Sequence, residues 1–197
     1  IFRKNSALQG SAVGGNDYYN GEYVLQNCLI YSNYGGYAVM NNGFRADGYM
    51  LDLSYCTIVD NPDGGVYCYP NTGSERRAGF RVVNSIIAWN GPLGIYYTSQ
   101  GTNFPAAVIQ YNDVYGQTID YSGDTMAGTG CVSVDPVFAS RTGNNYHLRN
   151  SSPCQGIGTN NGVAFDIEGA ARPHGSGYSL GCYEPPDVPS GTLLVIH

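Results

Sequence analysis

Few residues of this chain have the types and spacing that catalysis requires. Arg76 and Arg77 lie in the segment 70–79, and Arg45 and Asp47 lie in the equivalent segment one repeat earlier. Arginines could neutralise the carboxylate of an acidic sugar and take up the neighbouring proton, as a lyase reaction requires. Charged loop residues are more often simply solvated. We therefore expect no catalytic residues and keep Arg76 and Arg77 as candidates for contact with carbohydrate.

No arrangement of carboxylates or histidines indicates hydrolysis or metal binding. Asp60 and Asp63 fit a turn, where aspartate is common. No acid pair occupies successive positions on one strand face, as glycoside hydrolysis would require. His147, His174 and His197 lack metal-ligand spacing. We therefore expect no metal and no cofactor.

Tyrosine is more suggestive, because the chain has 18 of them. Tyr67 and Tyr96 are expected to share an outward position in neighbouring repeats, with Tyr69 close by. Such an aromatic ladder could stack against sugar rings while its hydroxyl groups stay in water. It could also be a cross-strand stack that only stabilises a sheet. The three tyrosines are therefore candidates for contact with carbohydrate, and both interpretations stay open.

An internal repeat must position these residues. Similar segments start at positions 5, 27, 55, 84 and 111, at intervals of 22 to 29 residues. Intervals of this size indicate a solenoid coil with loops of variable length. Leu25, Leu53, Val82 and Ile109 occupy one column of the repeat, and period-two alternation places that column on one strand face.

The phase of the apolar residues predicts how each coil is built. Inward-facing apolar residues alternate along each strand, and this alternation shifts by one residue at positions 27, 55, 84 and 111. A two-residue bend that contains a left-handed residue would explain the shift. A glycine-rich corner and a third short strand complete the coil. The predicted fold is an all-β, right-handed, single-stranded parallel β-helix with three strands per coil and a C-terminal capping module. An antiparallel sandwich has similar turn spacing, but it would not explain columns that recur in register.

Composition restricts the partners and the compartment. Lys4 is the only lysine and the net charge is −6, so we expect no nucleic-acid partner. No apolar run approaches the roughly 20 residues that span a bilayer. Six cysteines in a lysine-poor chain rich in tyrosine and glycine suggest an oxidising, extracytoplasmic setting.

Four cysteines are candidates for disulfides. Cys28 and Cys56 occupy the same column of adjacent coils, where strands lie about 4.8 Å apart. That spacing is near the short end of the disulfide range, so a bond and two stacked thiols both stay open. Cys154 and Cys182 are expected to pair across the capping module, with two buried thiols as the alternative.

From about Ile119 the repeat is lost and other motifs follow. They are D-P-x-F at 135–138, Y-x-L at 146–148, S-P-x-x-x-x-G at 152–158, D-x-x-G-x-x-R-P at 166–173 and G-x-Y-E at 181–184. Together with the coils, these motifs resemble the bacterial right-handed β-helix proteins of the choice-of-anchor Q type. The resemblance covers roughly residues 20–184 and implies a secreted or surface-displayed protein.

A solenoid ends in an open core that needs a cap. We expect this core to be closed by apolar residues of the C-terminal module, namely Phe138, Tyr146, Leu148, Phe165 and Tyr183. The predicted division is coils at 1–118, a cap at 119–184 and a linker or tail at 185–197.

These observations predict a non-catalytic, extracellular segment of a bacterial surface or secreted protein. Its function would be display, adhesion or contact with a polysaccharide or cell-surface glycan. One alternative is the C-terminal part of a polysaccharide lyase or glycoside hydrolase. Another is a structural subunit that associates head to tail through its first coil, which begins without a cap.

Overall fold

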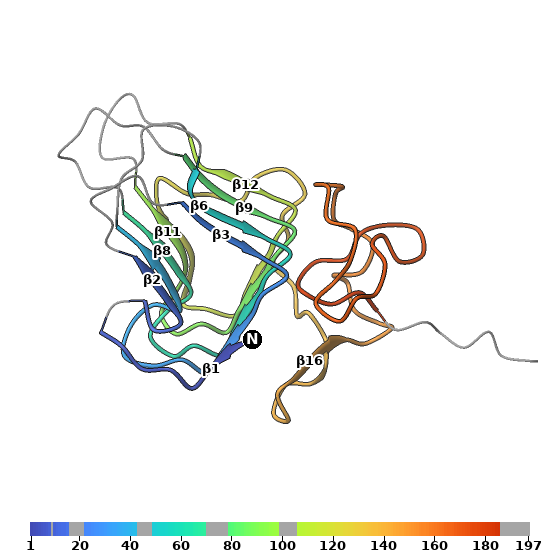
Figure 1. Cartoon of the computed structure of the whole chain (residues 1–197), viewed down its shortest axis with the longest axis horizontal. Coiled ribbons are helices and arrows are strands. Elements are labelled where there is room, and N and C mark those ends of the chain that lie inside the picture. The colour runs from blue at the N-terminus through green and yellow to red at the C-terminus, as the bar shows by residue number, and fades with distance from the viewer. Residues whose placement is uncertain (9, 16–21, 43–48, 70–78, 99–105, 186–197) are drawn as a thin grey trace, which may run out of the picture.

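The structure, a computed structural model, describes residues 1–8, 10–15, 22–42, 49–69, 79–98 and 106–185. These ranges contain strands, turns and irregular segments, and they include no helix of the length and apolarity that a membrane span needs. All but two of the described strands lie in three parallel sheets, which form the walls of a solenoid (Figure 1). The predicted all-β parallel β-helix is therefore confirmed.

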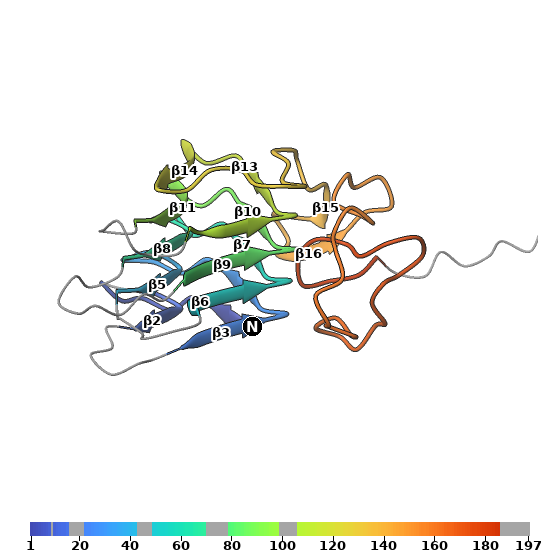
Figure 2. The ribbon, with the colours of Figure 1, turned by 90° about the horizontal axis from the view of Figure 1, so that it is seen from above.

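The chain passes from wall 1 to wall 2 to wall 3 and then begins the next coil (Figure 2). Wall 1 consists of β1 (Phe2–Arg3), β4 (Leu29–Tyr31), β7 (Thr57–Val59), β10 (Ile86–Ala88) and β13 (Asp113–Tyr115). Wall 2 consists of β2 (Val13–Gly15), β5 (Val39–Asn41), β8 (Val66–Cys68), β11 (Leu93–Tyr97) and β14 (Ile119–Gly123). Wall 3 consists of β3 (Tyr23–Gln26), β6 (Tyr49–Ser54), β9 (Gly79–Val83) and β12 (Val108–Gln110).

Apolar columns fill the interior of the solenoid. In wall 3, Leu25, Leu53, Val82 and Ile109 pair in register from coil to coil, and all four are buried. The matching columns are Ile30, Ile58, Ile87 and Val114 in wall 1 and Val39, Val66 and Ile95 in wall 2. Because parallel pairing stacks residues of equal register, each repeat extends one continuous core.

The bend between wall 3 and wall 1 has the conformation that the shift in alternation predicts. Asn27, Tyr55, Asn84 and Tyr111 have φ angles of 51°, 51°, 55° and 52°. These values lie in the left-handed region, which asparagine tolerates better than most residues. One such residue between the two strands shifts the alternation by one residue, so the following strand turns the other set of its side chains toward the core.

A buried asparagine ladder follows the corner between wall 1 and wall 2. Nδ2 of Asn5 donates to Oδ1 of Asn33 at 3.0 Å, and Nδ2 of Asn33 donates to Oδ1 of Asn61 at 3.0 Å. Nδ2 of Asn61 continues the ladder to Oδ1 of Asn90 at 2.8 Å. Because the amides of Asn33, Asn61 and Asn90 also bond to backbone groups, the ladder satisfies polar atoms that the corner would otherwise bury unpaired.

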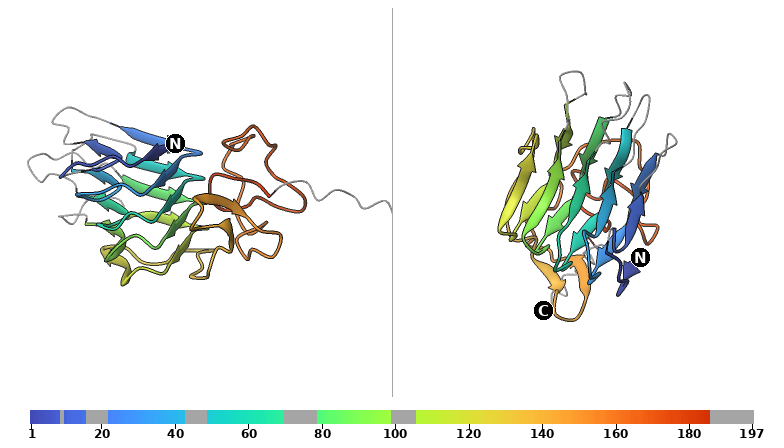
Figure 3. Two further views of the ribbon diagram at one scale, coloured as in Figure 1. Left: turned by 90° about the horizontal axis from the view of Figure 1, so that it is seen from below. Right: turned by 90° about the vertical axis from the view of Figure 1, so that its left-hand side faces the viewer.

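The C-terminal module lies against the side of the solenoid. We name residues 135–184 the side module; it contains the antiparallel pair β15 (Phe138–Ser140) and β16 (Asn145–Leu148). Figures 2 and 3 show it beside the coils, along the outer face of wall 1. Leu29, Val59 and Ile86 of wall 1 belong to a second core that the module completes. The module's own buried contributions are Phe138, Tyr146, Leu148, Cys154, Leu180, Cys182 and Tyr183.

The predicted capping of the open core by this module is therefore corrected. The outward face of wall 1 is apolar and must be covered, so the module packs there. Phe165, which we expected in the core, is 59% exposed. The described coils also continue past residue 118, because β14 pairs with β11 and Val132 bridges to Asp113.

Candidate functional site

A stack of tyrosine rings lies on the outer face of wall 2. Tyr67 pairs in register with Tyr96, and their ring centroids are 4.6 Å apart with an interplanar angle of 6°. Tyr37 stacks on the other side of Tyr67 at 4.7 Å and 21°. We call Tyr37, Tyr67 and Tyr96 the tyrosine ladder. The predicted shared position of Tyr67 and Tyr96 is confirmed, and Tyr37 is a member that the sequence did not indicate.

Each ring of the ladder stacks on its neighbour, so both faces of the Tyr67 ring are covered. A Cβ atom at Gly123, in the following coil, would lie 3.3 Å from Cε2 of Tyr96, so the Tyr96 end of the stack is also close to backbone. Stacking of a sugar on the face of Tyr67 is therefore blocked. Because the three side chains point outward from the wall and are only half-buried, their edges and hydroxyl groups are the surfaces that remain for a ligand.

Tyr69 extends this surface sideways. Its ring lies 6.3 Å from that of Tyr67 with an interplanar angle of 11°, and its backbone N–H donates to Asn41 at 2.8 Å. The structure therefore brings together Tyr67, Tyr69 and Tyr96, the three tyrosines predicted to contact carbohydrate. Their contact with carbohydrate stays a prediction.

The electrostatics of the ladder favour neutral hydroxyl groups. Burial, followed by the nearby phenols of Tyr96 and Tyr37, raises the pKa of Tyr67. Burial, followed by Tyr96, also raises the pKa of Tyr37. A neutral phenol can both donate and accept hydrogen bonds, which suits the hydroxyl groups of a sugar.

The charged candidates lie outside the described residues. Arg76 and Arg77 belong to the segment 70–78, which connects β8 of wall 2 to β9 of wall 3. Arg45 and Asp47 belong to the corresponding segment between β5 and β6. Contact of Arg76 and Arg77 with carbohydrate stays a prediction.

Several described carboxylates have structural partners. Asp52 forms an ion pair with Arg81 at 2.8 Å on wall 3. Asp60 forms one with Arg141 of the side module at 2.6 Å, and Asp63 accepts a hydrogen bond from the Gly35 backbone at 2.7 Å. Asp60 and Asp63 therefore connect parts of the fold. Asp60 also has a left-handed φ of 55°, and Asp63 lies in a turn, as expected of them.

A cavity in the side module, lined in part by charged side chains, was not indicated by the sequence. Its volume is about 330 Å³, and its lining includes His147, Asp166, Glu168, His174 and Glu184. Nε2 of His147 lies 3.0 Å from Oε2 of Glu168. These residues lie between positions 147 and 184 without a recurring spacing, so no sequence motif marks the cavity. Within the described ranges, no group of three or more histidine, cysteine or acidic side chains is arranged to hold a metal ion.

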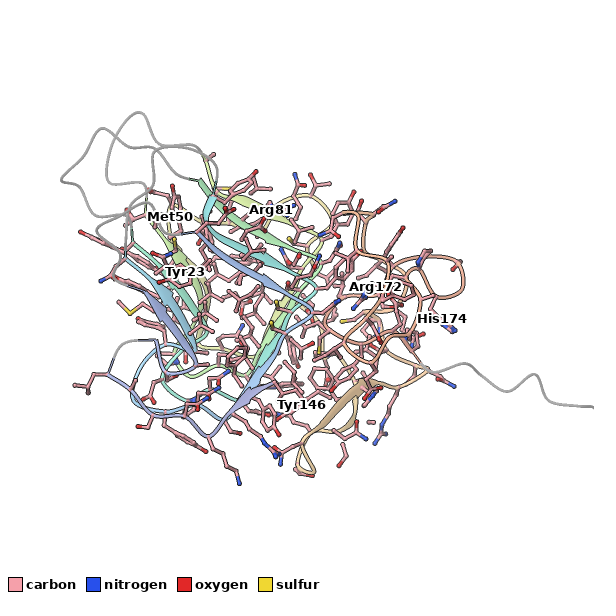
Figure 4. All side chains as sticks on the ribbon, viewed as in Figure 1. Tyr23, Met50, Arg81, Tyr146, Arg172 and His174 are labelled. Atoms are coloured by element: carbon pink, nitrogen blue, oxygen red, sulfur yellow. The ribbon has the colours of Figure 1, made fainter. Side chains whose placement is uncertain are left out.

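The motif residues of the side module bind one another. Oδ1 of Asp166 accepts hydrogen bonds from the backbones of Glu168 and Ala170, and Oδ2 accepts one from the backbone of Glu184. Arg172 and Glu184 form a fully buried ion pair at 2.6 Å. Figure 4 places Arg172 at the junction between the module and the coils and His174 on the far side of the module. The D-x-x-G-x-x-R-P and G-x-Y-E motifs therefore join to hold the module together.

All six cysteines are free thiols. The predicted Cys154–Cys182 bond is not formed, because the Cys154 thiol donates to Asp113 at 3.4 Å while the backbone N–H of Cys182 donates to Thr57. Cys28 and Cys56 are stacked thiols in adjacent coils. A hydrogen bond with Cys56 lowers the pKa of Cys28 to about 7.

One family model matches the chain. Residues 1–108 match the model described as right handed beta helix region, which is more than half of the 197 residues. No curated protein and no solved structure gives a significant match to the chain. The match ends before the side module and therefore does not cover the C-terminal motifs.

Proposed function

Because the chain belongs to the right-handed β-helix family, we propose that it is a non-catalytic, extracellular segment of a bacterial surface or secreted protein that contacts glycan through its tyrosine ladder. The bacterial surface setting is supported by the resemblance to choice-of-anchor Q proteins and by the composition. The ladder supports glycan contact. Fractionation of cells that produce the full protein tests the location, and recovery from the cytoplasm alone would contradict it.

The single observation that carries glycan contact is the regular outward stack on wall 2. Side chains from the same column repeat at the coil spacing, about 4.8 Å, which is comparable with the length of one sugar residue. The outward column contains Gly14, Met40, Tyr67, Tyr96 and Ser122, and none of these is charged. Such a surface suits a neutral, extended glycan that lies along the solenoid axis.

Glycan binding to an array tests this proposal. Tyr67→Ala combined with Tyr96→Ala should weaken binding by about tenfold or more, equivalent to about 1.4 kcal/mol. Tyr34→Ala is the matched control, because Tyr34 is 49% exposed and lies outside the ladder. Unchanged binding by the double variant, with circular dichroism like that of the original chain, would show that the ladder only stabilises the sheet.

The role of the hydroxyl groups can be separated from that of the rings. Tyr67→Phe combined with Tyr96→Phe keeps the stack and removes two hydroxyl groups. Since the ring faces are occupied, this variant should lose most of the affinity that the alanine variant loses. Full binding by the phenylalanine variant would instead assign the contact to the apolar ring edges.

The non-catalytic part of the proposal has its own test. Production of ultraviolet-absorbing, unsaturated oligosaccharides from a polysaccharide, abolished by Arg76→Ala, would contradict it and favour the lyase alternative.

Head-to-tail assembly is supported by one feature of the walls. β1, β2 and β3 each lie at the edge of their sheet at the same end of the stack. Unpaired strand edges can pair with another chain. Light scattering that increases with protein concentration would support assembly, and a constant monomeric mass would contradict it.

A further inference from the structure

One buried carboxyl group lies where the coils meet the side module. Asp113 belongs to the outward column of wall 1, together with Leu29, Thr57 and Ile86. All four residues are buried. At the position where two other coils place a leucine and an isoleucine, the last strand of wall 1 therefore places an ionisable side chain.

The carboxyl group of Asp113 contacts both the module and the segment that leads to it. Its Oδ1 accepts a hydrogen bond from the backbone N–H of Val134 at 3.0 Å. Its Oδ2 accepts one from the Cys154 thiol at 3.4 Å. The backbone N–H of Asp113 donates to Ser85 in the preceding coil at 2.9 Å. The strand is thus fixed to the coils while its side chain holds the module.

The surroundings of Asp113 do not compensate a negative charge. No ion pair joins it to an arginine, lysine or histidine in the described part of the chain. The ionisable groups that act on it are Asp120, Asp135, Cys154 and Tyr121, each of which is neutral or negative. An isolated buried carboxylate is strongly unfavourable.

We propose that Asp113 is a pH-sensitive contact that holds the side module on wall 1 when it is protonated and loosens the module when it is ionised. Loosening would uncover the apolar outer face of wall 1, including Leu29, Val59 and Ile86. The module thereby acts as a pH-dependent cover for this face.

The direction of the pH dependence follows from the two states. Burial raises the pKa of Asp113 from 3.8 to about 7 in the docked state, although the hydrogen bonds from Val134 and Cys154 oppose this. After release the carboxyl group is solvated and regains its ordinary pKa. At a pH between these two pKa values, Asp113 therefore carries a proton in the docked state and has lost it in the released state. Docking is strongest below about pH 4 and weakens as pH rises to about 7. Above about pH 7 Asp113 is ionised in both states, so it causes no further change in docking.

Hydrogen exchange of the whole chain tests the proposal, with Asp113→Asn as an isosteric variant that cannot ionise. Amides of β15 and β16 report opening of the module, and amides of β6 and β9 report opening of the coils. At each pH, comparing variant with original chain cancels the intrinsic exchange rates. The ratio of the protection factors of β15 and β16, variant over original chain, should rise by about tenfold per pH unit between about pH 4 and pH 7, because only the original chain loses docking strength in this range.

A second readout uses Trp89, the only tryptophan. Its ring lies 5.9 Å from that of Phe138 and 3.9 Å from the guanidinium of Arg141, both in the side module. Its fluorescence should change with pH in the original chain and stay constant in Asp113→Asn and in Asp113→Leu, which mimics Leu29. Asp135→Asn is the control, because this exposed residue acts on Asp113 as a nearby charge and not through a hydrogen bond. This variant should keep the pH dependence, with its midpoint moved slightly lower.

Two results would overturn the proposal. The first is a pH dependence that persists unchanged in both Asp113 variants. The second is an equal change in protection of β6 and β9, because the titration would then act on the whole fold rather than on docking of the module.

Discussion

The coils repeat the same contacts, whereas the side module uses each of its contacts once. In the asparagine ladder the bonded amides are 28 or 29 residues apart, and the same bond recurs from coil to coil. The module instead relies on single contacts such as the Arg172–Glu184 ion pair and the Asp166 turn. It has only one described pair of strands, β15 and β16.

This difference predicts different responses to substitution. A coil residue lost from a column leaves the same column intact above and below, so neighbouring coils limit the damage. A module contact has no copy elsewhere. Single substitutions of polar module residues should therefore cost more stability than comparable substitutions in the coils.

The largest expected effect is the loss of the buried ion pair in the module. Arg172→Met should lower the free energy of unfolding by about 3–5 kcal/mol, because Glu184 would remain buried without its partner. Urea denaturation at neutral pH measures this loss. Arg81→Met, which breaks a partly exposed ion pair on wall 3, is the control in the coils and should cost about 1 kcal/mol or less. Equal losses would remove the contrast between the two regions.

The apolar core of the coils should be the next most sensitive. Leu53→Ala should cost about 3 kcal/mol, because a fully buried side chain leaves a cavity between coils that cannot collapse. Val24→Ala on the same wall is the control: Val24 is 61% exposed and should change stability by less than about 0.5 kcal/mol. Thermal or urea unfolding distinguishes them, and a similar loss for both would contradict the inward assignment of the Leu53 column.

The asparagine ladder should show a smaller loss. Asn61→Ala removes the oxygen that accepts hydrogen bonds from both the backbone N–H and the side-chain amide of buried Asn33, which should cost about 2 kcal/mol. Asn150→Ala in an exposed turn is the control. Hydrogen exchange should locate the loss in the coils next to residue 61, while exchange in the side module stays unchanged. A loss spread evenly over both regions would argue against local damage in the coils.

The smallest effect concerns the polar contact between the two regions. Arg141→Ala removes a partly exposed ion pair with Asp60 and a cation–π contact with Trp89, together about 1 kcal/mol. A double-mutant cycle with Asp60→Asn isolates the ion pair. A coupling energy near zero would mean that the apolar core beneath wall 1 holds the module without this contact.

Much of the coil architecture could be predicted from local patterns. The Leu25 and Leu53 column and the left-handed bend at Asn27 and Tyr55 are both present, because alternation and turn conformation depend on near neighbours. The position of the C-terminal module was not predictable in this way. Phe138 and Tyr146 are visibly apolar, yet the pattern does not say whether they face the end of the core or the outside of wall 1.

The candidate site shows the same limit. The register of the repeat placed Tyr67 beside Tyr96, but Tyr37 lies two residues before β5 and joins the stack only in space. The Cys154–Cys182 pairing failed for a similar reason. Both residues are in the module, as expected, but docking on wall 1 turns one thiol toward Asp113 and places the other cysteine beside Thr57.

The amino-acid sequence by itself determined the parallel β-helix, its interior columns and the shared outward position of Tyr67 and Tyr96, because a repeated pattern constrains every coil in the same way. Only the tertiary structure decided that the module covers the side of wall 1, that tyrosine faces are used within the ladder, and that Asp113 is buried at the junction. These features depend on which surfaces meet across distances of about 20 to 145 residues in the chain. Such contacts are selected by packing and desolvation, which no local spacing records.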